Sequence, residues 1–207
     1  MSQFFHIHPT HPQPRLIRQA VEILRADHII AYPTDSSYAL GFCLGAKGAM
    51  ERVAAIRRID QDHNFTLVCR DLSEIASYAR VDNRQFRLLK AATPGPFTFI
   101  LKATHGVPKR LQNSKRKTVG IRVPHHPIAQ ALLAELGEPL MSSTLILPGE
   151  DAPMNDPEAI RAALERELGL VIDGGPCEQT PTTVLDLVDD VPVVLRQGLG
   201  DASPFLA

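Results

Sequence analysis

The stretch from His28 to Gly41 most constrains the fold, because it joins a buried strand to a polar turn. Ile29 to Tyr32 is a short apolar run of the kind that fills a buried strand. Pro33 ends the run, since proline lacks the N–H that a strand ladder needs. Three hydroxyls and a carboxylate follow, on Thr34, Asp35, Ser36 and Ser37. Ligands bind at the carboxyl ends of strands in open α/β sheets, so this segment predicts either a ligand site or an ordinary polar turn.

Short apolar runs alternate with amphipathic segments along the rest of the chain, which is typical of an α/β fold. We expect strands at 5–9, 29–32, 65–69, 97–102, 118–123, 139–147, 171–173, 182–188 and 193–196. We expect helices at 14–27, 47–58, 71–78, 82–92, 128–136 and 158–168. A βαβ unit should span 28–69, and the last two strands should pair antiparallel. The prediction is one α/β domain over 1–207, with a mixed, curved sheet and flanking helices.

Composition restricts the possible partners and the cell compartment. The 207 residues carry a net charge of −1, so any contact with a polyanion must come from a local patch. Three cysteines without a CxxC motif favour reduced thiols in a cytoplasmic protein. Neither a signal peptide nor a run of about 18 apolar residues is visible, which predicts no membrane segment.

Hydroxyl-bearing residues and arginines gather near the ends of predicted elements. The hydroxyl clusters are Thr34/Ser36/Ser37, Ser142/Ser143/Thr144 and Thr180/Thr182/Thr183, and the arginines are Arg57, Arg58, Arg122 and Arg196. Arg122 is the most informative, because it lies between apolar neighbours in the strand 118–123. A half-buried arginine needs an anion, and guanidinium groups bind carboxylates and phosphates well. The partner of Arg122 is therefore either a ligand or an internal Asp or Glu.

The segment from Lys109 to Lys117 is a dense positive run. Its basic residues are Lys109, Arg110, Lys115, Arg116 and Lys117. Such a run can follow a phosphate backbone or form a solvated loop, and both interpretations stay open. No cysteine or carboxylate completes a metal-ligand set with the histidines, so we expect no metal site. Without a glycine-rich phosphate loop, any nucleotide should occupy an unconventional pocket.

Six motifs, in order along the chain, resemble the threonylcarbamoyl-AMP synthase family. They are Tyr32-Pro-Thr-Asp-Ser-Ser-Tyr-Ala-Leu-Gly41, Thr93-Pro-Gly-Pro-Phe-Thr98, Gly120-Ile-Arg-Val-Pro124, Ile172-Asp-Gly-Gly175, Thr182-Thr-Val184 and Leu195-Arg-Gln-Gly198. The similarity extends over residues 5–200. The runs His63-Asn-Phe-Thr-Leu67 and Arg70-Asp-Leu-Ser-Glu74 are most similar to the YciO branch of that family.

The resemblance implies a twisted, open α/β sheet whose positively charged concave face binds ATP or an adenylate. It also implies binding of tRNA or other double-stranded RNA. The family joins L-threonine, bicarbonate and ATP into threonylcarbamoyl-AMP and pyrophosphate, for the modification of a tRNA adenosine. Carried over by position, the residues around the amino acid are Thr34, Arg122, Ser142 and Thr182. Those around the nucleotide are Arg57, Thr118, Thr144 and Arg196, with Arg58 beside them and Mg²⁺ accompanying ATP.

Two motifs of the synthases differ in this chain. Their K-x-R corresponds to Arg57-Arg58-Ile59, and their S-x-N corresponds to Thr144-Leu145-Ile146. Hydrogen bonds to charged groups contribute about 1.5–3 kcal/mol each, so losing two would slow catalysis by about 10² to 10⁴. We therefore expect a nucleotide- and RNA-binding member of the family, in or near tRNA threonylcarbamoylation, with weak or altered catalysis. The alternatives are a competent synthase that uses Arg57 and Arg58, and a double-stranded RNA-binding protein with a vestigial pocket.

Overall fold

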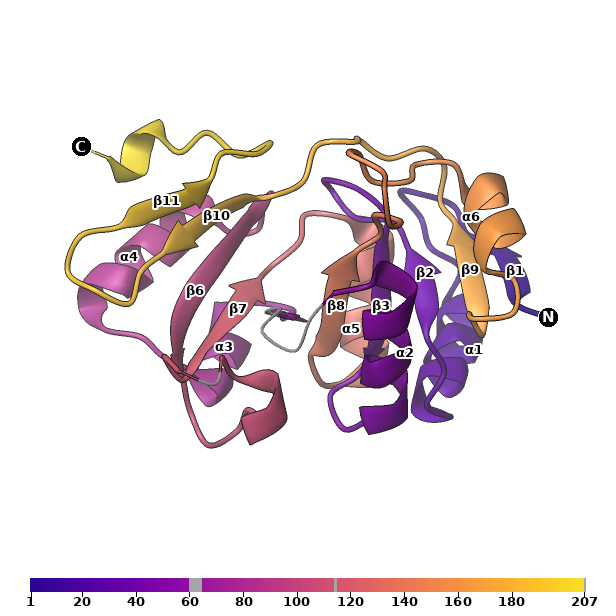
Figure 1. The fold of residues 1–207 in the computed structure, drawn as a ribbon, viewed down its shortest axis with the longest axis horizontal. Helices are drawn as coiled ribbons and strands as arrows, with labels where there is room; N and C mark the ends of the chain where they lie inside the picture. The colour runs from indigo at the N-terminus through magenta and orange to yellow at the C-terminus, as the bar shows by residue number, and fades with distance from the viewer. Residues whose placement is uncertain (60–64, 114, 207) are drawn as a thin grey trace.

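The computed structural model of the chain describes residues 1–59, 65–113 and 115–206. Within these ranges, eleven strands form one mixed sheet (Figure 1). They are β1 Gln3–His6, β2 Ile30–Tyr32, β3 Ala39–Cys43, β4 Thr66–Val68, β5 Ala79–Arg80, β6 Phe97–Ala103, β7 Thr118–Arg122, β8 Leu140–Thr144, β9 Leu170–Asp173, β10 Thr183–Asp186 and β11 Val193–Arg196. Their order is β1-β9-β2-β3-β8-β4-β7-β6-β10-β11, with β5 paired to β6. The sheet is open, because its end strands β1 and β11 do not pair with each other.

Six α-helices flank the sheet in the described ranges. They are α1 Pro14–Arg25, α2 Lys47–Arg57, α3 Leu72–Tyr78, α4 Asn83–Ala92, α5 Pro127–Leu136 and α6 Pro157–Leu164, and two 3₁₀ turns are η1 Lys109–Leu111 and η2 Ser203–Phe205. Helices α1 and α5 pack against each other. In Figure 1, α3 and α4 lie at the end of the sheet formed by β6, β10 and β11, while α1, α2, α5 and α6 lie at the other end. The sheet is thus continuous, and helices lie near both of its ends.

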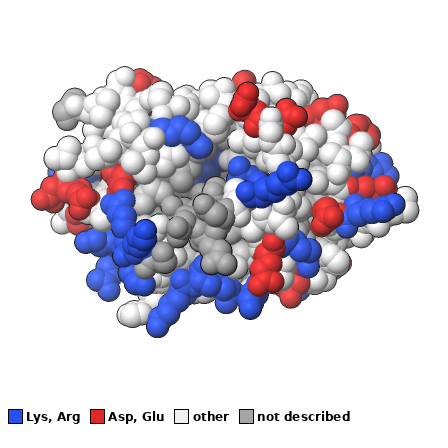
Figure 2. All heavy atoms as spheres, in the orientation of Figure 1, with Lys and Arg blue, Asp and Glu red and all other residues white. Residues whose placement is uncertain are grey.

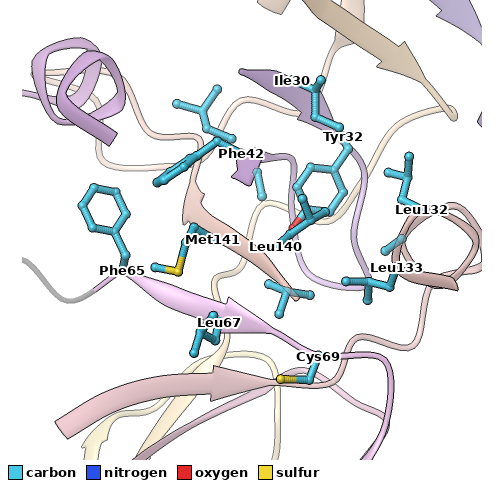
Figure 3. Packing of buried hydrophobic residues seen from close by; sticks show 14 of the residues in the cluster. Ile30, Tyr32, Phe42, Phe65, Leu67, Cys69, Leu132, Leu133, Leu140 and Met141 are labelled. Atoms are coloured by element: carbon cyan, nitrogen blue, oxygen red, sulfur yellow. The ribbon is translucent and has the colours of Figure 1, made fainter. Parts of the chain in front are cut away.

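The strands at the centre of the sheet send alternate side chains into an apolar core. These fully buried residues are Leu40 on β3, Leu67 on β4, Phe99 on β6, Ile121 on β7 and Met141 on β8. Figure 3 shows Leu67 and Met141 close to Phe42 and Phe65, with Leu132 and Leu133 of α5 in the same cluster. Burial of this face holds the register of the strands, because a slip of one residue would bring polar side chains into the core.

The intervening residues of the same strands are small or polar and point to the opposite face. Thr66 lies opposite both Gly120 and Ser142 in the ladder. Thr98 lies opposite Val184, and Ala39 lies opposite Thr144. Because cross-strand partners share a face, these residues form a largely polar surface across the six strands β3, β8, β4, β7, β6 and β10. This surface carries the candidate site.

Much of the predicted fold is confirmed, and one unit is wrong. The α/β class and the open mixed sheet are confirmed, each predicted helix overlaps an observed one, and β10 and β11 pair antiparallel. The βαβ unit over 28–69 is wrong, because the unexpected strand β3 follows β2 and pairs antiparallel with it. Both β3 and β4 are antiparallel to β8, so α2 joins two parallel strands that are separated by β8. His63 and Asn64 of the motif 63–67 lie outside the described residues.

Candidate functional site

A cavity of about 300 Å³ lies on the polar face of the sheet. Its hydroxyl-bearing lining residues are Thr66, Thr98, Thr118, Ser142, Ser143, Thr144 and Thr182. Its charged lining residues are Arg57, Arg116, Arg122 and Arg196, and no Asp or Glu among the described residues lines it. Figure 2 shows Lys and Arg side chains around the hollow in the middle of this face. The cavity therefore favours anions.

Arg57 and Arg196 are held by neutral oxygens. Arg57, the last residue of α2, donates from Nη1 to Ser143 Oγ at 2.5 Å and from Nε to the Ile146 carbonyl at 3.4 Å. Arg196 on β11 donates from Nε and Nη2 to the Thr182 carbonyl at 3.0 and 2.9 Å. Among the described residues, no carboxylate lies within ion-pair distance of either arginine. Two cations thus face the cavity without a carboxylate partner in the described part of the chain.

The pKa values of these two arginines are both lowered, by the same two causes. Burial lowers the pKa of Arg57, and the nearby charge of Arg196 lowers it further. Burial also lowers the pKa of Arg196, and the charge of Arg122 adds to the effect. Both shifts mean that the charged form of each arginine is disfavoured in the cavity, and a bound anion would stabilise that form.

Arg122 on β7 faces a possible ligand site and also pairs with an internal carboxylate, which are the two alternatives that the sequence leaves open. It is 7% exposed, lines the cavity, and forms an ion pair with Asp35. Its Nη2 also donates to Thr34 Oγ1 at 3.2 Å and to Ser36 Oγ at 3.0 Å. Its Nε is buried and has no hydrogen-bond partner within the described ranges. Arg122 is therefore charge-compensated but retains one unsatisfied donor, which is unusual for a buried group.

Thr34 organises the polar turn that meets Arg122. Its Oγ1 donates to the Ser37 carbonyl at 2.6 Å and accepts the N–H groups of Ser36 and Ser37 at 3.3 and 3.2 Å. Thr34 and Asp35 also line a second cavity of about 550 Å³, together with His126, Asn155, Pro176, Cys177, Glu178, Gln179 and Thr180. The two cavities are thus separated by the contact between this turn and Arg122.

Hydroxyl pairs and a glycine form the base of the first cavity. Thr98 and Thr182 lie 2.8 Å apart through their hydroxyl oxygens, and Ser142 Oγ lies 2.9 Å from the Tyr32 hydroxyl. A Cβ at Gly120 would lie 3.2 Å from Thr66 Oγ1 and 3.5 Å from Thr98 Cγ2. The glycine therefore keeps space open above the strands.

The structure brings most of the predicted site residues together. Around the first cavity lie Arg57, Thr118, Arg122, Ser142, Thr144, Thr182 and Arg196. Thr34 adjoins it through Arg122. Arg58 does not line it, because it caps α2 in the left-handed conformation with φ of 48° and is exposed. Ile146 lines the cavity, whereas Ile59 packs against the core.

Sequence reasoning does not assign several lining residues to the site, although some of them lie within the quoted motifs. They are Ala39, Thr66, Val68, Thr98, Ile100, Asn113 and Val184. The available signal is the alternation within predicted strands: if Arg122 faces the cavity, Gly120 and Thr118 face it too. Thr66 and Thr98 belong to strands whose neighbours in the sheet come from distant parts of the chain, so the alternation alone does not bring them to the site.

The basic run reaches the cavity through one of its residues, Arg116. Lys109 and Arg110 are exposed on η1, and Lys115, Arg116 and Lys117 are exposed before β7. Arg116 Nη1 lies 2.5 Å from the buried carboxylate of Asp186, and Arg116 also lines the cavity. The described residues contain no group of three or more metal-ligating side chains, and none of their helices has the length and apolar composition to cross a membrane.

Comparison with known proteins gives the same fold and motifs. A family model with the description "Telomere recombination", which covers Sua5, YciO and YrdC, matches residues 22–198. The Escherichia coli protein YciO is 59% identical over 206 residues, covering 100% of both chains. Its crystal structure has a TM-score of 0.97 to this chain. The resemblance to the YciO branch is therefore confirmed.

More distant relatives include a protein named as an enzyme. The threonylcarbamoyl-AMP synthase of Vibrio vulnificus is 27% identical over 186 residues, covering 88% of this chain and 98% of that protein. The structure of P. abyssi Sua5 complexed with L-threonine has a TM-score of 0.87 at 23% identity. It covers 95% of this chain and 58% of the Sua5 chain, so the likeness shows a shared fold over part of a longer protein.

Proposed function

The chain belongs to the Sua5/YciO/YrdC family, and from this premise we propose that its cavity binds ATP or an adenylate beside L-threonine. The V. vulnificus relative is a threonylcarbamoyl-AMP synthase, whose named product is an adenylate. The P. abyssi Sua5 that shares the fold is complexed with L-threonine. These likenesses support the class of ligand, and the residues of the cavity support the mode of binding.

The uncompensated charges of Arg57 and Arg196 are the observation that carries this proposal. Both guanidinium groups line one cavity of about 300 Å³ without a carboxylate partner among the described residues. Guanidinium groups form strong, charge-assisted bonds to phosphate oxygens. The phosphates of the nucleotide lie between these arginines, with the hydroxyls of Thr118 and Thr144 as further donors.

The Arg122 end of the cavity suits the amino acid. Thr34 accepts a hydrogen bond from Arg122, and Ser142 and Thr182 offer hydroxyls to the same cavity. The Nε of Arg122 has no partner among the described residues. A carboxylate is a strong acceptor for an unsatisfied guanidinium donor. L-threonine therefore places its carboxylate at Arg122 and its reacting nitrogen toward the nucleotide.

Mg²⁺ enters as part of the substrate. Among the described residues, the cavity has no carboxylate lining and no metal-ligating cluster. Because Mg²⁺ prefers oxygen ligands and binds readily to phosphates, the oxygens of ATP hold it in this cavity. The chain itself contributes the arginines that bind the remaining phosphate charge.

Catalysis in this chain is weak or altered relative to the synthases. Ile146 lines the cavity where they carry asparagine, and Ile59 packs against the core where they carry arginine. One polar donor is thereby replaced with hydrocarbon in the cavity, and a second is replaced at a position that packs against the core. Donors fixed at the developing charge lower the barrier more than they strengthen ground-state binding, so turnover suffers more than affinity.

Titration calorimetry with ATP tests the binding proposal. Arg57→Gln should weaken ATP binding about ten- to one-hundredfold, because it removes a charged hydrogen-bond donor from the cavity. Arg58→Gln is the matched control, since Arg58 is adjacent but exposed outside the cavity. Equal effects of the two variants would contradict the proposed nucleotide site. Pyrophosphate release equal to that of the V. vulnificus synthase would instead favour the competent synthase.

A second proposed function is the binding of tRNA or other double-stranded RNA at the basic run. Lys109, Arg110, Lys115, Arg116 and Lys117 are all exposed, and Arg116 also lines the cavity. Figure 2 shows Lys and Arg side chains gathered along the lower part of the face that carries the hollow. Such a patch contacts phosphates without reading bases. An RNA held there would lie close to the cavity, because Arg116 belongs to both.

The salt dependence of RNA binding tests this patch. Neutralising Lys115, Arg116 and Lys117 together should flatten the slope of log affinity against log salt by about two to three. The control neutralises the exposed Arg15, Arg18 and Arg25 of α1, far from the patch, and should leave the slope unchanged. An unchanged slope in the first variant would place RNA binding elsewhere. If RNA binds while ATP does not, the pocket is vestigial.

A further inference from the structure

One end of the molecule exposes most of its large apolar side chains. Apart from Met1, the large apolar side chains that the described residues expose are Phe86 on α4 and Val191, Val193, Leu195, Leu199 and Leu206 near the C-terminus. Figure 1 shows α4, β10, β11 and the C-terminus together at this end of the sheet. Gln85 of α4 donates from Nε2 to the Leu187 carbonyl, which ties the helix to the start of the β10–β11 turn. Exposed apolar groups gathered in one place mark a surface that binds a partner.

The backbone edge of β11 is a poor contact for such a partner. Within the described part of the chain β11 pairs with β10 alone, so its outer edge is open. The strand has only four residues, and a bulge disrupts its ladder with β10. Short, bulged edge strands resist pairing with another strand. The side chains at this end of the molecule must therefore supply the contacts.

The outer face of α4 carries an exposed aromatic ring beside two cations. Phe86, Arg87 and Lys90 are all exposed, and their helical spacing places them on one face. Leu89 points the other way and belongs to the same buried cluster as Phe99. Among the described residues, no carboxylate lies within ion-pair distance of Arg87 or Lys90. Aromatic and arginine side chains contribute most of the binding energy in many protein interfaces.

The turn between β10 and β11 has the complementary composition. Asp189, Asp190 and Val191 follow one another in this turn, and all three are exposed. Asp190 forms no ion pair within the described ranges, and the Asp189 carboxylate lies 4.0 Å from Arg116, at the limit for such a pair. The turn thus presents two negative charges and an apolar side chain, whereas α4 presents two positive charges and an aromatic ring.

We propose that a second copy of this chain docks on this end of the molecule, with the turn 189–191 of each copy against the outer face of α4 of the other. Both halves of the complementary pair lie on the same end of one chain, so a two-fold axis between the copies forms the two contacts at once. Opposite charges attract in each contact, and Val191 covers the ring of Phe86. This surface is separate from the proposed nucleotide site, because α4 packs on the core side of the sheet and the cavity lies on the polar side.

Sedimentation velocity of the full chain tests the proposal. Over about a hundredfold range of concentration, the mass of the wild type should rise from that of one chain toward that of two. One variant combines Arg87→Glu with Lys90→Glu, and a second combines Asp189→Lys with Asp190→Lys. Each should raise the dissociation constant at least about tenfold, because like charges then face each other. An equimolar mixture of the two variants should restore the two-chain species, since the reversed charges are again complementary.

The matched control combines Arg15→Glu with Arg18→Glu, which reverses two exposed charges at the same spacing on α1. It should leave the association as in the wild type. A wild type that stays a single chain at every concentration overturns the proposal without any variant. A mixture that does not recover also overturns it, as does an equal loss in the control. If a single-chain wild type binds RNA and the α4 variant weakens that binding, the cations of α4 contact RNA and the proposed dimer is wrong.

Discussion

The hydroxyl oxygens of Tyr32 and Ser142 lie 2.9 Å apart, which ties a fully buried ring on β2 to the base of the cavity on β8. The ring crosses β3 at Gly41, where a Cβ would lie 2.8 Å from Tyr32 Cε1. Burial raises the pKa of Tyr32, so its hydroxyl keeps its proton as a donor. Ser142 Oγ also lies 3.3 Å from the Leu40 carbonyl, to which it donates. The Tyr32 hydroxyl and the Leu40 carbonyl therefore fix the orientation of the Ser142 hydroxyl.

Tyr32→Phe should remove the hydrogen bond that orients the Ser142 side chain, without changing the shape of the core. We expect the free energy of unfolding to fall by about 1 kcal/mol, because one buried hydrogen bond is lost. The affinity for L-threonine should fall several-fold as the Ser142 hydroxyl gains freedom. Tyr38→Phe is the control, since the Tyr38 hydroxyl donates to the Gly175 carbonyl at 2.8 Å, away from the cavity lining. Urea denaturation and calorimetry measure the two effects, and equal losses of affinity would contradict a specific role for Tyr32.

Two glycines should respond differently to alanine. At Gly41 the new Cβ meets the buried ring of Tyr32, so Gly41→Ala should lower the free energy of unfolding by about 1–3 kcal/mol. At Gly120 the new Cβ meets cavity-lining groups at 3.2 Å or more, so Gly120→Ala should cost less stability. It should weaken ligand binding more, because it narrows the cavity. Thermal melting with and without ATP separates the two losses. A Gly120→Ala variant with normal affinity would mean that the ligand does not reach this strand.

The stability of the chain should depend on pH through His126. Its Nδ1 accepts the Ile128 N–H at 3.3 Å as the N-cap of α5. Burial lowers the pKa of His126, while Asp35 raises it and the charges of Arg122 and His125 lower it. The unfolded chain therefore takes up this proton at a higher pH than the folded chain. Stability is full above the ordinary histidine pKa of about 6.5 and is lost as the pH falls below it.

His126→Asn should remove this part of the pH dependence, because asparagine caps a helix without titrating. Urea midpoints at pH 7.5 and 5.5 measure the change, and the variant should lose less stability than the wild type. His105→Asn alters an exposed histidine that does not affect the pKa of His126, and it should behave like the wild type. If both variants show the wild-type loss, the acid sensitivity comes from another group.

The sequence predicts those parts of the fold whose signals are local. Pro33 after Ile29–Tyr32, and Pro124 after β7, fix the ends of two strands because proline interrupts a ladder. Strand β3 carries a glycine at its centre, which weakens its signal, and it follows β2 after a short turn. Its presence reverses the direction of the chain before α2. The prediction of a βαβ unit over 28–69 is wrong for this reason. In addition, no local signal indicates that β8, which lies far along the chain, is inserted between β3 and β4.

The candidate site divides in the same way. The arginines and hydroxyls beside prolines and glycines could be predicted, because their residue types suit anions and their positions suit strand ends. An internal carboxylate partner for Arg122 could be predicted only as an alternative to a ligand. The sequence does not identify Asp35 as that partner, since 86 residues separate the two. Tyr32 carries no site signal at all. Its hydroxyl reaches Ser142 only because Gly41 leaves space between them, and that depends on the register of three strands.

By the motif resemblance, Ile59 and Ile146 correspond to an arginine and an asparagine of the synthases. Ile146 lines the cavity next to Arg57, whose Nε donates to the Ile146 carbonyl at 3.4 Å. The double variant Ile59→Arg with Ile146→Asn should raise pyrophosphate release about tenfold or more, while ATP affinity changes less. The reason is that restored donors act mainly on charge that develops in the transition state. Each single variant should do little if the two donors act as a unit.

Leu195→Asn is the matched control for this gain, because Leu195 is half-exposed, lines the same cavity and would add the same amide at another wall. It should leave pyrophosphate release unchanged. Melting temperature must be measured beside activity, since Ile59 packs against the core and Ile59→Arg removes that contact. A double variant that only loses thermal stability means that both isoleucines serve packing. A wild-type chain that already matches the V. vulnificus synthase in turnover also contradicts the prediction, and it would mean that Arg57 and Arg58 suffice for catalysis.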